Sequence, residues 1–186
     1  AVNDGFDYRT DGTAEDFLFL SDLLRRRTAL NDAEAILTFL TEKLEAVKGK
    51  RSPLLAEAYG RLGTLQSEQG RAFKARLILM KAVSWAKELT GPNSPATLDA
   101  LLQLATVETR GLHFEEARKG LDEALDILDN AKKPDPIRLA RAKQQMGELF
   151  ITQRRIIDSL KWYNEARELR ERTLGPKHLE TAQSLV

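Results

Sequence analysis

The sequence predicts an all-α fold, a right-handed α-solenoid of stacked antiparallel helix pairs. The first observation is a period, because Pro92, Pro134 and Pro176 lie 42 residues apart. The second is that apolar residues recur every three or four residues, as on one face of a helix, and no segment alternates as a strand would. The third is that small residues recur at fixed positions of the period, as close helix packing requires. Together these observations favour a short array of helical repeats.

Shifting the chain against itself by 42 residues aligns four copies of the repeat. In each copy, a position that we call a column holds the same kind of residue, small in some columns and large in others. The first small column holds Ser21, Gly63, Ala105 and Gly147. The second small column holds Ala33, Ala75, Ala117 and Ser159, and one large column holds Leu37, Leu79, Leu121 and Tyr163.

Helix boundaries are indicated by capping residues at matching places in the copies. A Ser or Asp N-cap precedes a proline at the first helical position in Ser52-Pro53, Ser94-Pro95 and Asp135-Pro136. Glycines suited to a left-handed helix C-cap stand at Gly49, Gly91 and Gly175. A second break inside each copy falls at Thr28–Asn31, Gly70, Gly111-Leu112 and Gln153-Arg154. The predicted organisation is a polar tail 1–12, repeats 13–53, 54–95, 96–137 and 138–179, and the start of a fifth repeat or a truncated capping helix at 180–186.

Composition excludes several classes of function. The 186 residues include 29 Lys plus Arg, 28 Asp plus Glu and no Cys, so no disulfide, zinc–thiolate site or thiol nucleophile is available. No apolar run approaches the roughly 20 residues that span a bilayer, so we expect a soluble chain without membrane insertion. His113 and His178 are isolated and no catalytic or metal motif occurs, which predicts a non-enzyme without cofactor or metal. The compartment stays open between the cytoplasm and a processed organellar or exported form.

The columns also resemble a known family. Those of the second copy, Tyr59, Leu62, Gly63, Gly70, Ala75, Leu79 and Ala82, resemble the tetratricopeptide repeat. The length of 42 residues and the junctions Thr90–Thr97 and Leu174–Thr181 are similar to those of the long, kinesin-light-chain-like class. The resemblance implies a protein-interaction scaffold that binds a partner in a concave groove lined by the first helix of each pair.

Many long-repeat members hold an extended peptide with paired asparagines in the first helix. The corresponding pairs here are Leu18-Phe19, Gly60-Arg61, Leu102-Gln103 and Gln144-Gln145, and only the last supplies two amides. We therefore expect a groove of mixed charge with exposed aliphatic anchors (Leu18, Leu102 and Ile151), suited to an amphipathic helix. The predicted groove residues are Leu18, Asp22, Arg25, Arg26, Thr64, Glu68, Leu102, Thr106, Arg110, Arg141, Gln144, Gln145, Glu148 and Ile151.

The favoured function is a non-catalytic adaptor that acts in the assembly or regulation of a protein complex. One alternative is a structural module that self-associates through an open C-terminal end, because the fifth repeat is incomplete. A less favoured alternative is nucleic-acid binding through the basic fourth repeat. The aromatics of that repeat, Phe150, Trp162 and Tyr163, occupy core-like columns, and the net charge of the chain is only +1.

Overall fold

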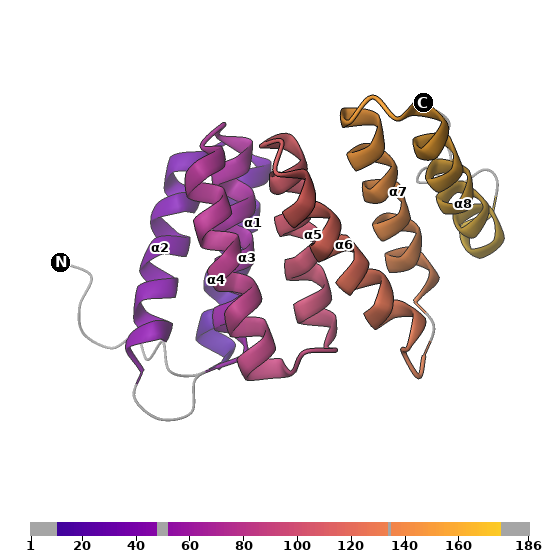
Figure 1. Ribbon diagram of the computed structural model, residues 1–186. Helices are drawn as coiled ribbons and strands as arrows, with labels where there is room; N and C mark the ends of the chain where they lie inside the picture. Colours follow the sequence, from indigo (N-terminus) through magenta and orange to yellow (C-terminus); the bar gives the residue numbers. More distant parts are fainter. Residues whose placement is uncertain (1–10, 48–51, 134, 176–186) are drawn as a thin grey trace, which may run out of the picture. The chain divides into compact units, whose positions relative to one another are not determined.

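A computed structural model describes residues 11–47, 52–133 and 135–175, and within these ranges the regular structure is entirely α-helical (Figure 1). The helices are joined alternately by tight turns and by longer junctions. They are α1 (Asp11–Arg26), α2 (Leu30–Ala46), α3 (Leu54–Glu68), α4 (Ala72–Thr90), α5 (Pro95–Arg110), α6 (Phe114–Asp129), α7 (Pro136–Thr152) and α8 (Ile156–Leu174).

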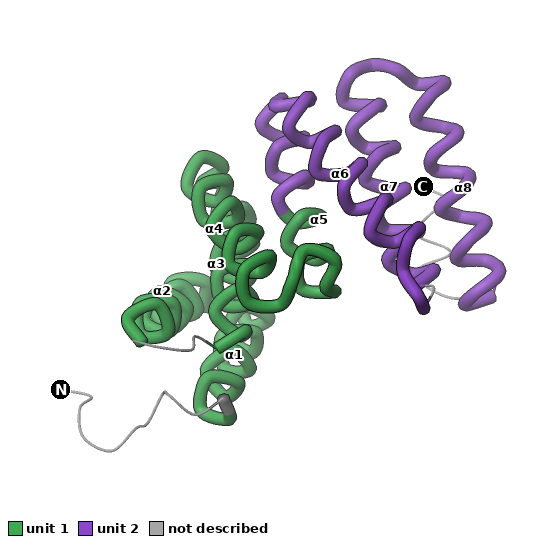
Figure 2. The backbone as a smooth tube through the Cα atoms, turned by 60° about the horizontal axis from the view of Figure 1, so that its bottom comes forward, with its two compact units in different colours: residues 1–103 green, residues 104–186 purple. Residues whose placement is uncertain are grey.

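The chain forms two compact units, residues 1–103 and 104–186, and the division falls within α5 (Figure 2). In the first unit α1 packs on α2, α3 packs on α4, and α3 also contacts α1 and α2. In the second unit α7 packs on both α6 and α8. The proposed repeat boundaries stay predictions, since the compact units are larger than one repeat. Helix α1 begins at Asp11, inside the segment predicted as a tail, and residues 180–186 lie outside the described ranges.

The small columns lie where two helices of one pair approach most closely. A Cβ added to Gly63 of α3 would lie 2.5 Å from Cγ of Leu79 on α4. A Cβ added to Gly147 of α7 would lie 3.1 Å from the ring of Tyr163 on α8. The same two columns therefore face each other in both units, and a methyl group would collide with Leu79 at Gly63 and crowd the ring of Tyr163 at Gly147.

The N-caps follow the sequence prediction at two of three places. The Ser94 Oγ accepts a hydrogen bond from the Thr97 amide at 3.1 Å, and Asp135 Oδ1 accepts one from the Arg138 amide at 2.9 Å. Ser52 Oγ accepts from the Leu54 amide, but α3 begins at Leu54, so Pro53 is the N-cap and not the first helical residue.

The junction glycines have the expected sign of φ but not the expected cap. Gly91 has φ 98° and ψ 155°, and Gly175 has φ 87° and ψ 158°. A left-handed helical cap would need ψ near 47°, so this part of the prediction is wrong. The chain leaves each helix in an extended direction that is open only to glycine, and does not curl back over the last turn. Gly49 lies outside the described residues.

The turn within each helix pair has the same geometry four times. Thr28, Gly70, Leu112 and Arg154 are 42 residues apart and all have φ between 61° and 74°. After each of them, the next amide donates to the carbonyl five residues back, as in the bond from Ala29 to Leu24. This is the Schellman arrangement, which satisfies the last carbonyls of the first helix. The predicted turn at Gly111-Leu112 is present, but Leu112 and not Gly111 has the positive φ.

Candidate binding site on the first helices

A pocket of about 270 Å³ lies among the first helices of the unit formed by residues 1–103. We call it the first-helix pocket. Helix α1 supplies polar side chains to the pocket, and α3 supplies polar and apolar ones. Helix α2 supplies two apolar side chains, and α5 supplies one amide. The lining residues are Ser21, Asp22, Arg25, Ala33, Leu37, Arg61, Thr64, Leu65 and Gln103.

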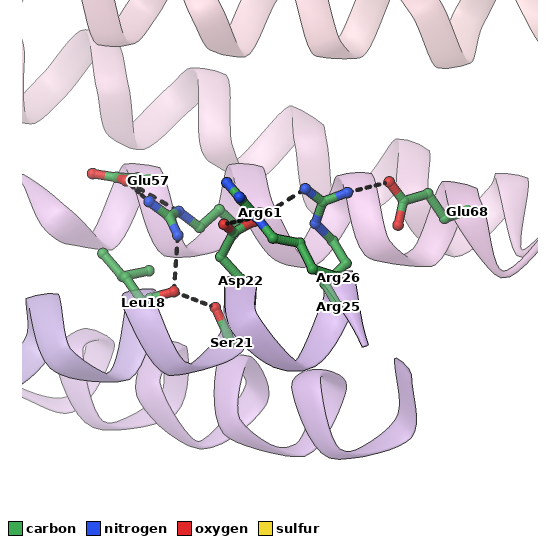
Figure 3. A network of polar contacts seen from close by, with 8 residues as sticks. All are labelled: Leu18, Ser21, Asp22, Arg25, Arg26, Glu57, Arg61 and Glu68. Carbon is green, nitrogen blue, oxygen red and sulfur yellow. Dashed lines mark hydrogen bonds and ion pairs between the residues drawn. The ribbon is translucent and has the colours of Figure 1, made fainter. Parts of the chain in front are cut away.

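Four of the predicted groove residues form one ion-pair network beside this pocket (Figure 3). Asp22 accepts hydrogen bonds from Arg25 at 3.0 Å and from Arg26 at 2.8 Å. Arg25 also donates to Glu68 on α3 at 2.9 Å. The hydrogen bond from Arg25 lowers the pKa of Asp22, so this carboxylate stays charged at neutral pH.

Arg61 was not predicted as a groove residue, yet it connects α3 to α1 at the pocket. Its Nη1 donates to the backbone oxygen of Leu18 at 2.8 Å, and its Nη2 donates to Glu57 at 2.7 Å (Figure 3). Ser21 Oγ donates to the same Leu18 oxygen at 2.7 Å. The sequence did contain a signal for it. Arg61 stands where long-repeat members have the second of their paired asparagines, in the column Phe19, Arg61, Gln103 and Gln145.

Gln103 places a buried acceptor at the pocket. Its Oε1 is buried without a hydrogen-bond partner, and it lies 2.9 Å from the position that a Cβ on Gly60 would occupy. Glycine at position 60 therefore makes room for the amide. A buried carbonyl-type oxygen without a donor is costly, and a donor from a bound molecule would remove that cost.

Leu18 and Leu102 do not lie on an exposed groove, so the prediction of exposed aliphatic anchors is wrong for both. Leu18 is 2% exposed and belongs to the hydrophobic core of the first unit, and Leu102 is completely buried. At this column the prediction was wrong by one residue, which is about 100° around a helix. The next residue along the chain, Gln103, lines the pocket in place of Leu102. Ile151 is exposed as expected.

Thr64, another predicted groove residue, lines the first-helix pocket. The other predicted groove residues lie on α5 and α7 of the second unit, and several are bonded to each other. Gln145 donates from Nε2 to Thr106 at 3.0 Å, and Gln144 donates to Glu148 at 3.4 Å while accepting from Arg170. Both amides therefore make contacts inside the unit, although the Oε1 of Gln145 is buried without a hydrogen-bond partner. Arg110 and Arg141 are exposed.

One histidine contact joins the end of α5 to the turn that follows it. His113 Nδ1 lies 3.1 Å from Oε2 of the buried Glu108, a contact that ties the turn after α5 to that helix. Within the described ranges, no three His, Asp or Glu side chains are grouped as metal ligands would be. No helix in those ranges is long and apolar enough to cross a membrane.

Several basic residues of the fourth repeat are paired with carboxylates. Lys143 Nζ lies 2.6 Å from Glu165 and 5.1 Å above the ring of Trp162. Arg138 pairs with Asp135 at 2.6 Å, and Arg155, the N-cap residue of α8, pairs with Asp158 in its first turn. These pairs reduce the positive potential that nucleic-acid binding would need.

Comparison with known proteins agrees with this architecture. Two family models described as tetratricopeptide repeat match residues 55–130 and 139–180. The chain belongs to the tetratricopeptide repeat family. Among curated protein sequences, none matches the chain.

Solved structures share the fold of this tetratricopeptide repeat protein at low sequence identity. BtubC (BKLC) from P. vanneervenii superposes with a TM-score of 0.80 at 19% identity, over 93% of this chain and 69% of that one. Kinesin light chain TPR-like repeats from Podosopora anserina give 0.75 at 13% identity, over 91% and 80%. A Rap protein in complex with competence and sporulation factor gives 0.73 at 14%, over 91% and 45%. The fold is thus a TPR-like α-solenoid, a scaffold class that typically mediates protein interactions without catalysis.

Proposed function

We propose that this chain is a non-catalytic adaptor that holds a segment of a partner protein at the first-helix pocket. The observation that carries the proposal is the unpartnered Oε1 of Gln103 beside that pocket. A main-chain N–H or a side-chain amide of a bound segment would supply the missing donor. Membership in a family of interaction scaffolds supports the same conclusion.

The charges around the pocket favour a segment of mixed charge. Arg25, Arg26 and Arg61 are balanced by Asp22, Glu57 and Glu68. A strongly acidic or strongly basic partner would meet repulsion from half of this network, whereas a segment carrying both signs can replace several pairs. Such an adaptor would serve the assembly or regulation of a complex.

The test compares partner capture from the native source by the intact chain and by two variants. Gln103→Met keeps the side-chain length and removes the acceptor, so we expect at least tenfold weaker capture of a partner held there. Lys119→Glu on the exposed surface of α6 is the control, and it should retain the partner.

Mass spectrometry identifies the partner, and circular dichroism verifies that both variants fold. Equal capture by Gln103→Met and the intact chain would contradict the proposal. Leu102→Asp, which the sequence alone suggests, is unsuitable because it would bury a charge in the core.

A further inference from the structure

Helix α1 has an exposed apolar face, whereas the corresponding faces of α3 and α7 are buried. Leu20 and Leu23 are 42% and 40% exposed, and the neighbouring Phe19 is also exposed. In α3 the residues of the same two columns, Leu62 and Leu65, are 5% and 0% exposed. In α7 the equivalent pair, Met146 and Leu149, is likewise buried.

The cover in the later repeats comes from the preceding helix pair. Helix α3 contacts both α1 and α2, and its Arg61 donates to the backbone of α1. Helix α7 contacts α6, and its Gln145 donates to Thr106 of α5. Among the described helices, α1 contacts only α2 and α3, and its Leu20 and Leu23 stay exposed.

Charged residues flank this apolar face in a self-complementary order. Asp16, Leu20, Leu23 and Arg27 are all exposed and follow the spacing of one stripe along the helix. Within the described ranges, neither Asp16 nor Arg27 forms an ion pair. They are separated by 11 positions in the sequence, about 16 Å along a helix.

We propose that α1 pairs with α1 of a second copy of this chain in an antiparallel, two-fold dimer. The two-fold axis passes between Leu20 and Leu23, so each Leu20 meets Leu23 of the other copy. The same operation brings Asp16 of each copy to Arg27 of the other, at both ends of the interface. An isologous contact of this kind uses one surface patch on both subunits and closes at two copies.

The dimer interface differs from the first-helix pocket. Asp22 and Arg25 of α1 line the pocket, whereas the proposed interface uses Asp16, Leu20, Leu23 and Arg27. A single helix face gives a small interface, so we expect a dissociation constant on the order of 10–100 µM.

The test is sedimentation equilibrium of the whole chain from about 5 to 500 µM, a range that brackets the expected constant. Asp16→Arg places two like charges at each end of the interface, and so does Arg27→Asp. Each single variant should dissociate at least tenfold more readily than the wild type. An equimolar mixture of the two should associate again, because every contact between the variants pairs opposite charges. Glu88→Arg, at an exposed position of α4, is the matched control and should dimerise like the wild type.

A wild-type chain that stays monomeric over the whole range would overturn the proposal. A dimer that survives both charge reversals, or a mixture that fails to recover association, would also overturn it. Circular dichroism of every variant separates lost pairing from lost folding. Gln103→Met should leave the dimer intact, so failure of the dimer and failure of the adaptor function are distinguishable.

Discussion

Thr28, Leu112 and Arg154 hold a left-handed backbone conformation that glycine adopts without steric cost. Gly70 is the one glycine among the four turn positions. The three others are held there by the Schellman hydrogen bonds on either side and by the packing of the two helices that they join. Such strain costs roughly 1 kcal/mol per residue.

Leu112→Gly should therefore stabilise the protein by about 1 kcal/mol. Leu112 is 63% exposed, so little packing is lost with its side chain. Gly70→Ala, at the same place in the second repeat, should destabilise by a similar amount. Urea unfolding followed by circular dichroism measures both changes. A lower midpoint for Leu112→Gly would show that its side chain contributes more than the strain costs.

Glu34 joins α2 to α4. Its carboxylate lies 2.7 Å from Arg71 and 3.0 Å from Lys74. Burial would raise the pKa of Glu34, but hydrogen bonds from Lys74, Gln66 and Arg71 outweigh it and lower the pKa to about 2. These two ion pairs of Glu34 thus connect α2 to the start of α4.

Glu34→Gln should cost on the order of 1 kcal/mol at pH 7. Because the folded-state pKa lies below the ordinary value of 4.5, the contribution is complete above pH 4.5. The contribution should fall as the pH drops from 4.5 toward 2. Urea midpoints of the wild type and variant across this range measure it. A stability difference that stays constant down to pH 2 would assign the effect to packing and not to charge.

The contact between Gly63 and Leu79 sets the separation of α3 and α4. Gly63→Ala places a methyl group against Leu79 and should destabilise the protein by about 1–3 kcal/mol. Adding Leu79→Ala should make the cost of the Gly63 substitution much smaller, which a double-mutant cycle measures. Gly12→Ala on α1 is the control, because no atom lies within 4 Å of its added Cβ. Equal effects of the two glycine substitutions would refute a steric origin.

At the scale of the whole molecule, cohesion is local, because within each unit a helix packs mainly on its neighbours in sequence. Gly63→Ala should therefore lower hydrogen-exchange protection mainly in α3 and α4 of the first unit. Protection of α7 and α8, in the second unit, should change much less. Exchange followed by mass spectrometry gives the profile, and a uniform loss over all helices would show that the two units unfold as one.

The sequence by itself determined the helical class, the period of 42 residues and the small columns, because these depend on local spacing and on residue size. Three of the residues that it predicted for a partner-binding groove, Asp22, Arg25 and Thr64, line the first-helix pocket in the structure. The sequence could not determine the rotation of each first helix to within one residue. For this reason Leu18 and Leu102 were predicted to be exposed, whereas the structure buries both.

Only the tertiary structure decided which unpartnered amide oxygen lies at the first-helix pocket. It is Oε1 of Gln103, whereas Gln145, whose Oε1 is also buried without a donor, lies in the second unit and donates to Thr106. Only the tertiary structure shows that Leu20 and Leu23 lack the cover that their equivalents have in the later repeats. The physical reason is that columns repeat along a sequence, whereas burial and hydrogen-bond partners depend on which helix lies opposite.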